Sequence, residues 1–112
     1  FEHDLFLAEI EPHIRRLAEK AWQGYERERA EPHGRIARTV VLKLKTDDFR
    51  ILTRSLTPPE PPASLEALAD IACALRERVE LPSRTRYRLV GVGLSGFVDA
   101  DRLAASQSDL FG

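Results

Sequence analysis

The sequence has too few cysteines for an internal disulfide and no apolar run long enough for a membrane span. Its single cysteine, Cys73, excludes a disulfide within the chain and fits a reducing compartment. No apolar run approaches the roughly 18–20 residues that cross a bilayer, and no signal-peptide pattern opens the chain. We therefore expect a cytoplasmic protein with no membrane partner. Methionine is absent even at position 1, which indicates a piece of a longer protein.

Groups of catalytic residues are also scarce. The three histidines, His3, His13 and His33, are too far apart to form a local metal motif. Asp47 and Asp48 are adjacent, and neighbouring residues point apart in a strand or turn, so a hairpin turn is the better interpretation of this pair. With 112 residues the chain suits one domain and leaves little room for a catalytic module. We expect no catalytic residue, metal or cofactor in this chain.

The first half of the sequence predicts a helix and a hairpin. Apolar residues recur at three- and four-residue steps between residues 7 and 30, which predicts an amphipathic helix starting near Glu11. Residues 39–45 alternate between apolar and polar and predict a half-buried strand. After turn residues at 46–48, residues 49–55 continue as a second, antiparallel strand.

The second half predicts one helix, one strand and a tail. A proline-rich connector precedes Ser64, a suitable N-cap for a helix with apolar residues on one face up to residue 81. Residues 87–97 then predict a final strand with small residues on its open side, namely Gly91, Gly93 and Ser95. From residue 99 the chain is polar, acidic and without a period, which predicts a flexible tail at 99–112 after a domain at 1–98.

This order of elements predicts an α+β fold. We expect the split βαβ (ferredoxin-like) plan, a two-layer sandwich in which two helices cover one face of an antiparallel sheet. The first strand is absent or represented only by residues near Phe1. In that plan the first strand usually sits in the middle of the sheet.

Charge is distributed in blocks although the net charge is −1. The net charges of successive segments are −3 for 1–34, +4 for 35–57, −3 for 58–82, +3 for 83–98 and −2 for 99–112. The positive blocks contain the predicted strands and the negative blocks the predicted helices. One face of the domain should therefore be basic and the other acidic.

The strand segments resemble a known family. They read TVVLKLK, DFR, TRS, RLVGV and LS at residues 39–45, 48–50, 53–55, 88–92 and 94–95. In this order they resemble the little-finger domain of Y-family translesion DNA polymerases. The resemblance implies a sheet whose open face lies across template-primer duplex DNA. It also implies a longer parent enzyme, a nucleotidyltransferase that adds nucleotides with Mg²⁺ in a separate palm domain.

The resemblance and the basic strands together assign candidate DNA contacts. We expect phosphate contacts from basic side chains and hydroxyl or backbone N–H donors beside them. The basic set is Lys43, Lys45, Arg54 and Arg88, with Arg38 and Arg86 flanking it, and the donors are Thr53 and Ser55. Family members often carry Arg where this chain has Gly93.

The last residues resemble a second motif. Gln107 followed by Leu110 and Phe111 resembles the peptide by which bacterial polymerases dock on the sliding clamp, so we expect the clamp as a partner. Ser108 departs from the Leu that is common at that position.

Two other functions stay open at this point. The first is an RNA-binding or ribosome-associated module, which normally carries aromatics on its two central strands, whereas no aromatic occupies an outward position here. The second is a small-molecule regulatory domain, which would need a pocket at a dimer interface and no basic sheet.

Overall fold

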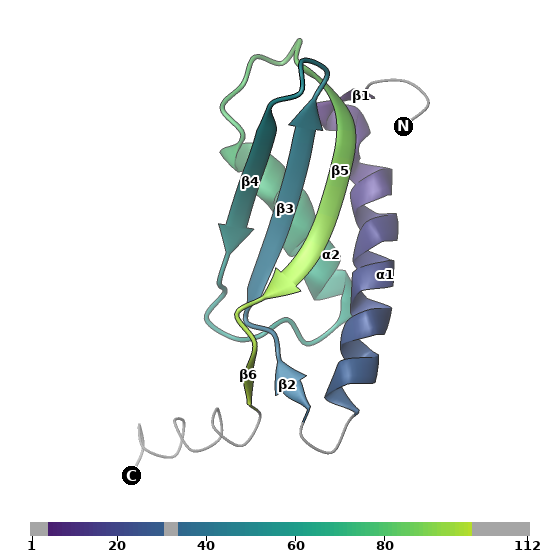
Figure 1. Cartoon of the computed structure of the whole chain (residues 1–112), viewed down its shortest axis with the longest axis vertical. Coiled ribbons are helices and arrows are strands. Elements are labelled where there is room, and N and C mark those ends of the chain that lie inside the picture. The colour runs from purple at the N-terminus through teal and green to yellow at the C-terminus, as the bar shows by residue number, and fades with distance from the viewer. Residues whose placement is uncertain (1–4, 31–33, 100–112) are drawn as a thin grey trace.

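The computed structural model of the chain describes residues 5–30 and 34–99. It contains two α-helices, two short 3-10 helices and six strands in the described part (Figure 1). In chain order they are β1 (Leu5–Phe6), η1 (Leu7–Glu9), α1 (Glu11–Arg29), β2 (Arg35–Ile36), β3 (Thr39–Thr46), β4 (Ile51–Leu56), α2 (Leu65–Ala74), η2 (Leu75–Arg78), β5 (Arg86–Ser95) and β6 (Val98–Asp99).

The main sheet has four antiparallel strands in the order β1-β5-β3-β4. Figure 1 shows α2 passing behind β3 and β4 while α1 runs along the β5 side. The face of the sheet toward the viewer is open. The predicted α+β class, with two helices on one face of an antiparallel sheet, is confirmed.

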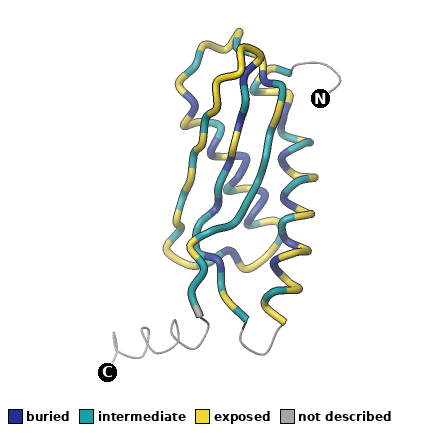
Figure 2. Tube along the Cα trace, in the orientation of Figure 1, coloured by how far each residue is buried: buried dark blue, intermediate teal, exposed yellow. Residues whose placement is uncertain are grey.

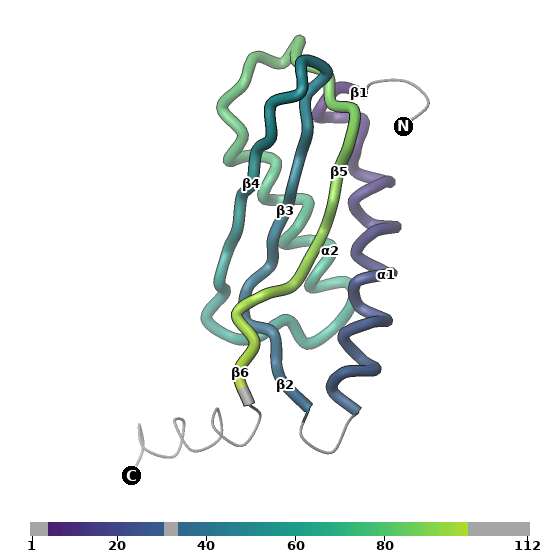
Figure 3. The backbone as a smooth tube through the Cα atoms, in the orientation of Figure 1, coloured from purple at the N-terminus to yellow at the C-terminus, as the bar shows by residue number. Residues whose placement is uncertain are grey.

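The first strand lies at the edge of the sheet and not in its middle. Among the described residues, β1 pairs only through Leu5 with Tyr87 and Phe6 with Arg86, at one end of β5 (Figure 3). The ten-residue β5 takes the central place and pairs with β3 along its length. A central strand must form hydrogen bonds on both sides along its length, which a two-residue strand cannot do.

Local sequence signals set the helix boundaries. Pro12 is tolerated in α1 because it lies in the first turn, where its missing N–H is not needed. At α2 the Ser64 hydroxyl accepts a hydrogen bond from the Ala67 N–H at 3.1 Å, as expected of an N-cap. α2 ends at Ala74 and tightens into η2, so the regular helix is shorter than predicted.

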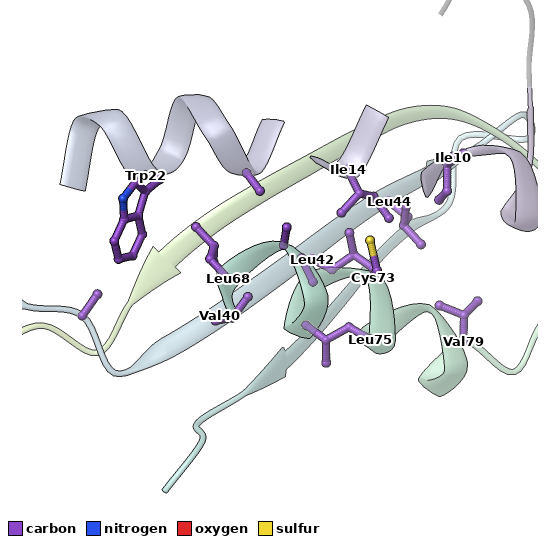
Figure 4. Packing of buried hydrophobic residues seen from close by; sticks show 14 of the residues in the cluster. Ile10, Ile14, Trp22, Val40, Leu42, Leu44, Leu68, Cys73, Leu75 and Val79 are labelled. Carbon is purple, nitrogen blue, oxygen red and sulfur yellow. The ribbon is translucent and has the colours of Figure 1, made fainter. Parts of the chain in front are cut away.

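The core lies between the helices and the sheet. Figure 4 shows Val40, Leu42 and Leu44 of β3 facing the apolar side chains of the two helices. Each of the three is at most 1% exposed. Burial of an aliphatic side chain stabilises a fold by about 1.5–3 kcal/mol, so the alternation of β3 determines which face of the sheet is covered.

The β3–β4 turn is longer than predicted. β4 begins at Ile51, and the turn is closed by Thr46 N–H donating to the Arg50 carbonyl at 2.9 Å. Phe49 has a φ of 68°, the left-handed region that is costly for a residue with a side chain. Figure 2 shows this end of the hairpin as exposed.

A second, two-stranded sheet pairs β2 with β6 and was not predicted. The Tyr25 hydroxyl of α1 accepts a hydrogen bond from the Ala37 N–H at 3.1 Å, and its ring contacts Phe97 edge-on. These contacts attach the pair to the end of α1. β6 reaches Asp99, the first residue of the predicted tail, and the rest of that tail lies outside the described residues.

No helix in the described part of the chain is long and apolar enough to cross a membrane.

Candidate nucleic-acid interface

Strand register brings the predicted polar residues together in rows on the open face. Lys43 of β3 lies between Thr53 of β4 and Gly91 of β5. In the neighbouring row on this face, Val41 lies between Ser55 of β4 and Gly93 of β5. Because side chains alternate along a strand and Leu42 is buried, Lys43 and Val41 share the open face.

The open face is basic. The three long strands contain no Asp or Glu, so no strand carboxylate offsets the charge of Lys43 and Lys45. Lys43 is exposed and Lys45 is half-buried. The matching prediction of an acidic helix layer is wrong for α1, which has five Lys or Arg side chains and four Glu. The block containing α1 is acidic because of Glu and Asp residues outside that helix.

Two glycines leave the middle of this face flat. A Cβ built on Gly93 meets nothing within 4 Å, and one built on Gly91 meets only the Lys43 Cβ at 3.8 Å. Neither residue has a positive φ. Glycine in a strand interior weakens the strand, and it also marks places where another backbone approaches closely. The internal packing of this domain therefore does not explain either glycine.

The hairpin end of the face combines cations with exposed apolar side chains. Phe49 is 61% exposed, and its ring centre lies 4.3 Å from the Arg88 guanidinium and 5.2 Å from the Lys45 ammonium. In the same row as Lys45 are Ile51 and Leu89, which are 61% and 52% exposed. This patch was not predicted, because the left-handed backbone at Phe49 cannot be identified from the residue type.

Arg86 lies at the β1 edge of the sheet. It is paired with Phe6 in the register, and its guanidinium is 4.9 Å from the centre of the Phe6 ring. Arg86 is exposed, so the second predicted flanking cation remains accessible.

Arg54 and Arg38 are not in the rows formed by the other predicted contacts. Arg54 is opposite Leu42 in the register, so its side chain leaves β4 on the helix side, and its Nε donates to the Arg78 carbonyl at 3.1 Å. Arg38 precedes β3 at its far end and has a buried Nε with no hydrogen-bond partner in the described part of the chain. The open face thus unites six of the eight predicted contacts: Lys43, Lys45, Thr53, Ser55, Arg86 and Arg88.

The Asp48 carboxylate forms hydrogen bonds within its own hairpin turn. Asp48 accepts hydrogen bonds from the Thr46 hydroxyl and from Arg50, and those bonds hold the pKa of the Asp48 carboxyl below its ordinary value. Among the residues that the structure describes, no group of three or more His, Cys, Asp or Glu side chains could hold a metal ion.

Cys73 packs in the core. Burial raises the pKa of its thiol above the ordinary value, although Arg15 and Arg76 oppose that shift. A protonated, buried thiol is a poor nucleophile.

Comparison with known proteins decides the family. Residues 1–110 match the impB/mucB/samB family C-terminal domain. The chain belongs to this family. Together with the relatives described below, the match confirms the resemblance to the little-finger domain of Y-family polymerases.

The chain is similar to several bacterial proteins that are named DNA polymerase IV. It is 62% identical over its full length to that of Xanthomonas campestris pv. campestris (strain 8004), where it covers 30% of the relative. It is 54% identical over 99% of its length to that of Stenotrophomonas maltophilia (strain R551-3), covering 29%. The protein of Neisseria gonorrhoeae (strain ATCC 700825 / FA 1090) is 36% identical over 96% of this chain, which covers 28% of it. The chain therefore spans under a third of the length of these relatives.

Proposed function

We propose that the open face binds duplex DNA without regard to sequence, as part of a lesion-bypass DNA polymerase. The observation that carries the proposal is the pair of neighbouring rows centred on Lys43 and Val41. They combine a cation and two hydroxyl groups with two glycines that leave the face flat, on strands without a carboxylate. A polymerase must slide along any template, which needs phosphate contacts more than base contacts. The relatives named DNA polymerase IV support this use of the face.

The remaining functions of the parent protein follow from the family. We propose that nucleotide addition, a nucleotidyl transfer with Mg²⁺ as cofactor, takes place in a palm domain elsewhere in the longer chain. This domain would hold the template-primer duplex while those other domains of the same chain act on its end. The domain would then contribute affinity, and its removal would lower the number of nucleotides added per binding event.

The DNA proposal is tested by removing two charges from the open face. In Lys43→Gln with Lys45→Gln we expect weaker binding of a labelled duplex in fluorescence anisotropy. The slope of log affinity against log salt should become less steep by about 1.8, because each lost phosphate contact changes it by about 0.9. The control is Lys20→Gln with Arg27→Gln, which removes the same charge from exposed positions on α1. Equal effects of the two pairs would show that only net charge matters and would reject the open face as the binding surface.

An RNA-binding module remains the second candidate and is separated by competition. The exposed Phe49 offers one ring beside two cations, which favours stacking with an unpaired base. The open-face positions of the central strands β3 and β5 carry no aromatic side chain, which favours duplex DNA. If equimolar single-stranded RNA displaces the duplex DNA, RNA binding becomes the favoured function and duplex DNA binding the second candidate.

We also propose that the C-terminal peptide tethers the domain to the sliding clamp. Its residues Gln107, Leu110 and Phe111 lie outside the described residues, so the proposal rests on the sequence motif. Leu110→Ala with Phe111→Ala should abolish clamp pull-down and leave DNA binding unchanged. Ser108→Leu, which restores the common residue, should strengthen clamp binding. Clamp binding retained by the double alanine variant would reject the tether.

A further inference from the structure

Three of the four exposed large apolar side chains in the described part of the chain lie together at the hairpin end of the sheet. Phe49 and Ile51 are each 61% exposed, and Leu89 is 52% exposed. In the register Ile51 and Leu89 flank Lys45, and the Arg88 guanidinium lies over the Phe49 ring. We call these five residues the hairpin patch. Contiguous exposed apolar surface on a soluble domain marks a site of interaction.

The turn holds Phe49 outward at a cost to its backbone. Its φ of 68° lies in the left-handed region, which a residue with a bulky side chain rarely adopts. Two hydrogen bonds fix the turn, from the Phe49 N–H to the Thr46 carbonyl at 3.0 Å and from the Thr46 N–H to the Arg50 carbonyl at 2.9 Å. Strained residues that the surrounding structure fixes in this way cluster where proteins bind ligands. The exposed ring is therefore in place before any partner arrives.

A hollow of about 350 Å³ lies beside these apolar side chains. Its lining consists of Lys43, Leu44, Lys45, Ile51, Leu89, Val90 and Gly91. Ile51 and Leu89 have no planar surface on which a base could stack and no donor for a phosphate. Duplex DNA therefore does not account for them, whereas an apolar side chain that enters the hollow would cover both. Aromatic and arginine side chains, both present here, are enriched at protein–protein interfaces.

The cations around the hollow need carboxylates from a partner. Lys45 is already half-buried, and its ammonium lies 5.2 Å from the centre of the Phe49 ring. Covering a charge further is costly unless it is paired. β3, β4 and β5 contain no Asp or Glu, and Asp48 in the turn is paired with Arg50 at 3.0 Å. A complementary partner thus carries negative charge beside its apolar side chains.

We propose that the hairpin patch binds an acidic segment of a partner protein in which carboxylates alternate with large apolar side chains. The apolar side chains of that segment enter the hollow and cover Ile51 and Leu89. Its carboxylates pair with Lys45 and Arg88, as acidic motifs do with clusters of basic side chains. The inference does not rest on the proposed DNA binding, because the three apolar residues of the patch are not among the predicted DNA contacts.

The test measures binding of labelled synthetic peptides by fluorescence anisotropy. The probe alternates Asp with Leu, and two comparison peptides replace its Leu residues by Ser or its Asp residues by Lys. We expect the wild-type chain to bind the Asp–Leu peptide, the Asp–Ser peptide more weakly and the Lys–Leu peptide not at all. Ile51→Thr with Leu89→Thr, which keeps the charges and residues that suit a strand, should lower the affinity for the Asp–Leu peptide by more than about tenfold.

A matched pair of phenylalanine variants separates the patch from folding. Phe49→Asn should weaken peptide binding without lowering the melting temperature, because Asn adopts the left-handed backbone more readily than Phe. Phe6→Asn is the control, since Phe6 is also exposed and its ring also contacts an arginine, Arg86, but at the β1 edge. This control should keep the wild-type affinity for the Asp–Leu peptide.

Defined results would overturn the proposal. Absence of binding to the wild type, or equal binding of the Asp–Leu and Asp–Ser peptides, would show that the patch does not select apolar side chains. Wild-type affinity in Phe49→Asn and in the threonine pair would place the peptide elsewhere. Tighter binding by a chain that ends at Asp99 would identify the acidic tail of the chain itself as the occupant. Loss of single-stranded oligonucleotide binding in Phe49→Asn, with no peptide bound by the wild type, would assign the patch to unpaired bases.

Discussion

Gly93→Val should stabilise the domain and weaken its binding to DNA. The backbone at Gly93 does not need glycine, and a Cβ there meets nothing within 4 Å. Replacing glycine in a strand interior by a β-branched residue contributes up to about 1 kcal/mol. The new side chain would lie beside Val41 on the neighbouring strand, and such a cross-strand pair adds roughly 0.2–1 kcal/mol. The expected gain of about 1 kcal/mol corresponds to a rise in melting temperature of roughly 4–8 °C.

The same side chain would stand between the sheet and the duplex. If the DNA backbone lies against the glycine floor, valine at position 93 prevents that approach, and we expect an affinity loss of about tenfold, or about 1.4 kcal/mol. Circular dichroism gives the melting temperature, and fluorescence anisotropy with a labelled duplex at low salt gives the affinity. The two measurements should move in opposite directions.

Gly24→Ala is the matched control for Gly93→Val. Gly24 is exposed on α1, and a Cβ there also meets nothing within 4 Å. Alanine should stabilise the helix by about 0.8–1 kcal/mol and leave DNA affinity unchanged. Wild-type affinity in Gly93→Val would refute the placement of DNA against the glycine floor. A lower melting temperature in Gly93→Val would show that the fold itself requires glycine at position 93. It would refute the interpretation that only DNA binding requires it.

Three further predictions concern the fold itself. Gly96→Ala should lower stability by more than about 1 kcal/mol in urea unfolding, because Gly96 has a φ of 64° and its Cβ would lie 2.8 Å from the Thr39 hydroxyl oxygen. Tyr25→Phe should cost about 1–3 kcal/mol, since the buried Ala37 N–H loses its acceptor, and an unchanged urea midpoint would contradict this. The pKa of Asp48 is lowered in the folded state, so its stabilising contribution is present above the ordinary value of 3.8 and is lost as the pH falls through the folded pKa. Asp48→Asn should therefore melt below the wild type at neutral pH, and the two melting temperatures should converge in acid.

The agreement between sequence and structure is best where the signal is local. The helix predicted near Glu11 begins there, and Ser64 caps α2 as expected. The alternation in β3 correctly assigned Val40, Leu42 and Leu44 to the core. Helix periodicity, caps and strand alternation each depend on a few neighbouring residues, so one sequence is enough to read them.

The candidate site was only partly predictable. Lys43 and Lys45 follow from alternation in one strand, and the register confirms that they share the open face. The face of Arg54 depends on where β4 begins and on its pairing with β3, and a shift of one residue reverses every side chain. Its meeting with Arg78 joins residues 24 apart in sequence, which no local pattern reveals.

What the sequence determined alone is the set of elements, the basic strands, the flat glycine positions and membership of a polymerase family. The tertiary structure decided which strand is central, which arginines leave the open face, and that Phe49 is held outward by a left-handed turn. Elements form from interactions between near neighbours, whereas strand order, register and edge contacts come from burial and hydrogen bonding between distant parts of the chain. The proposed contact of this domain with a phosphate backbone therefore depends on how its strands are assembled as well as on the charges they carry.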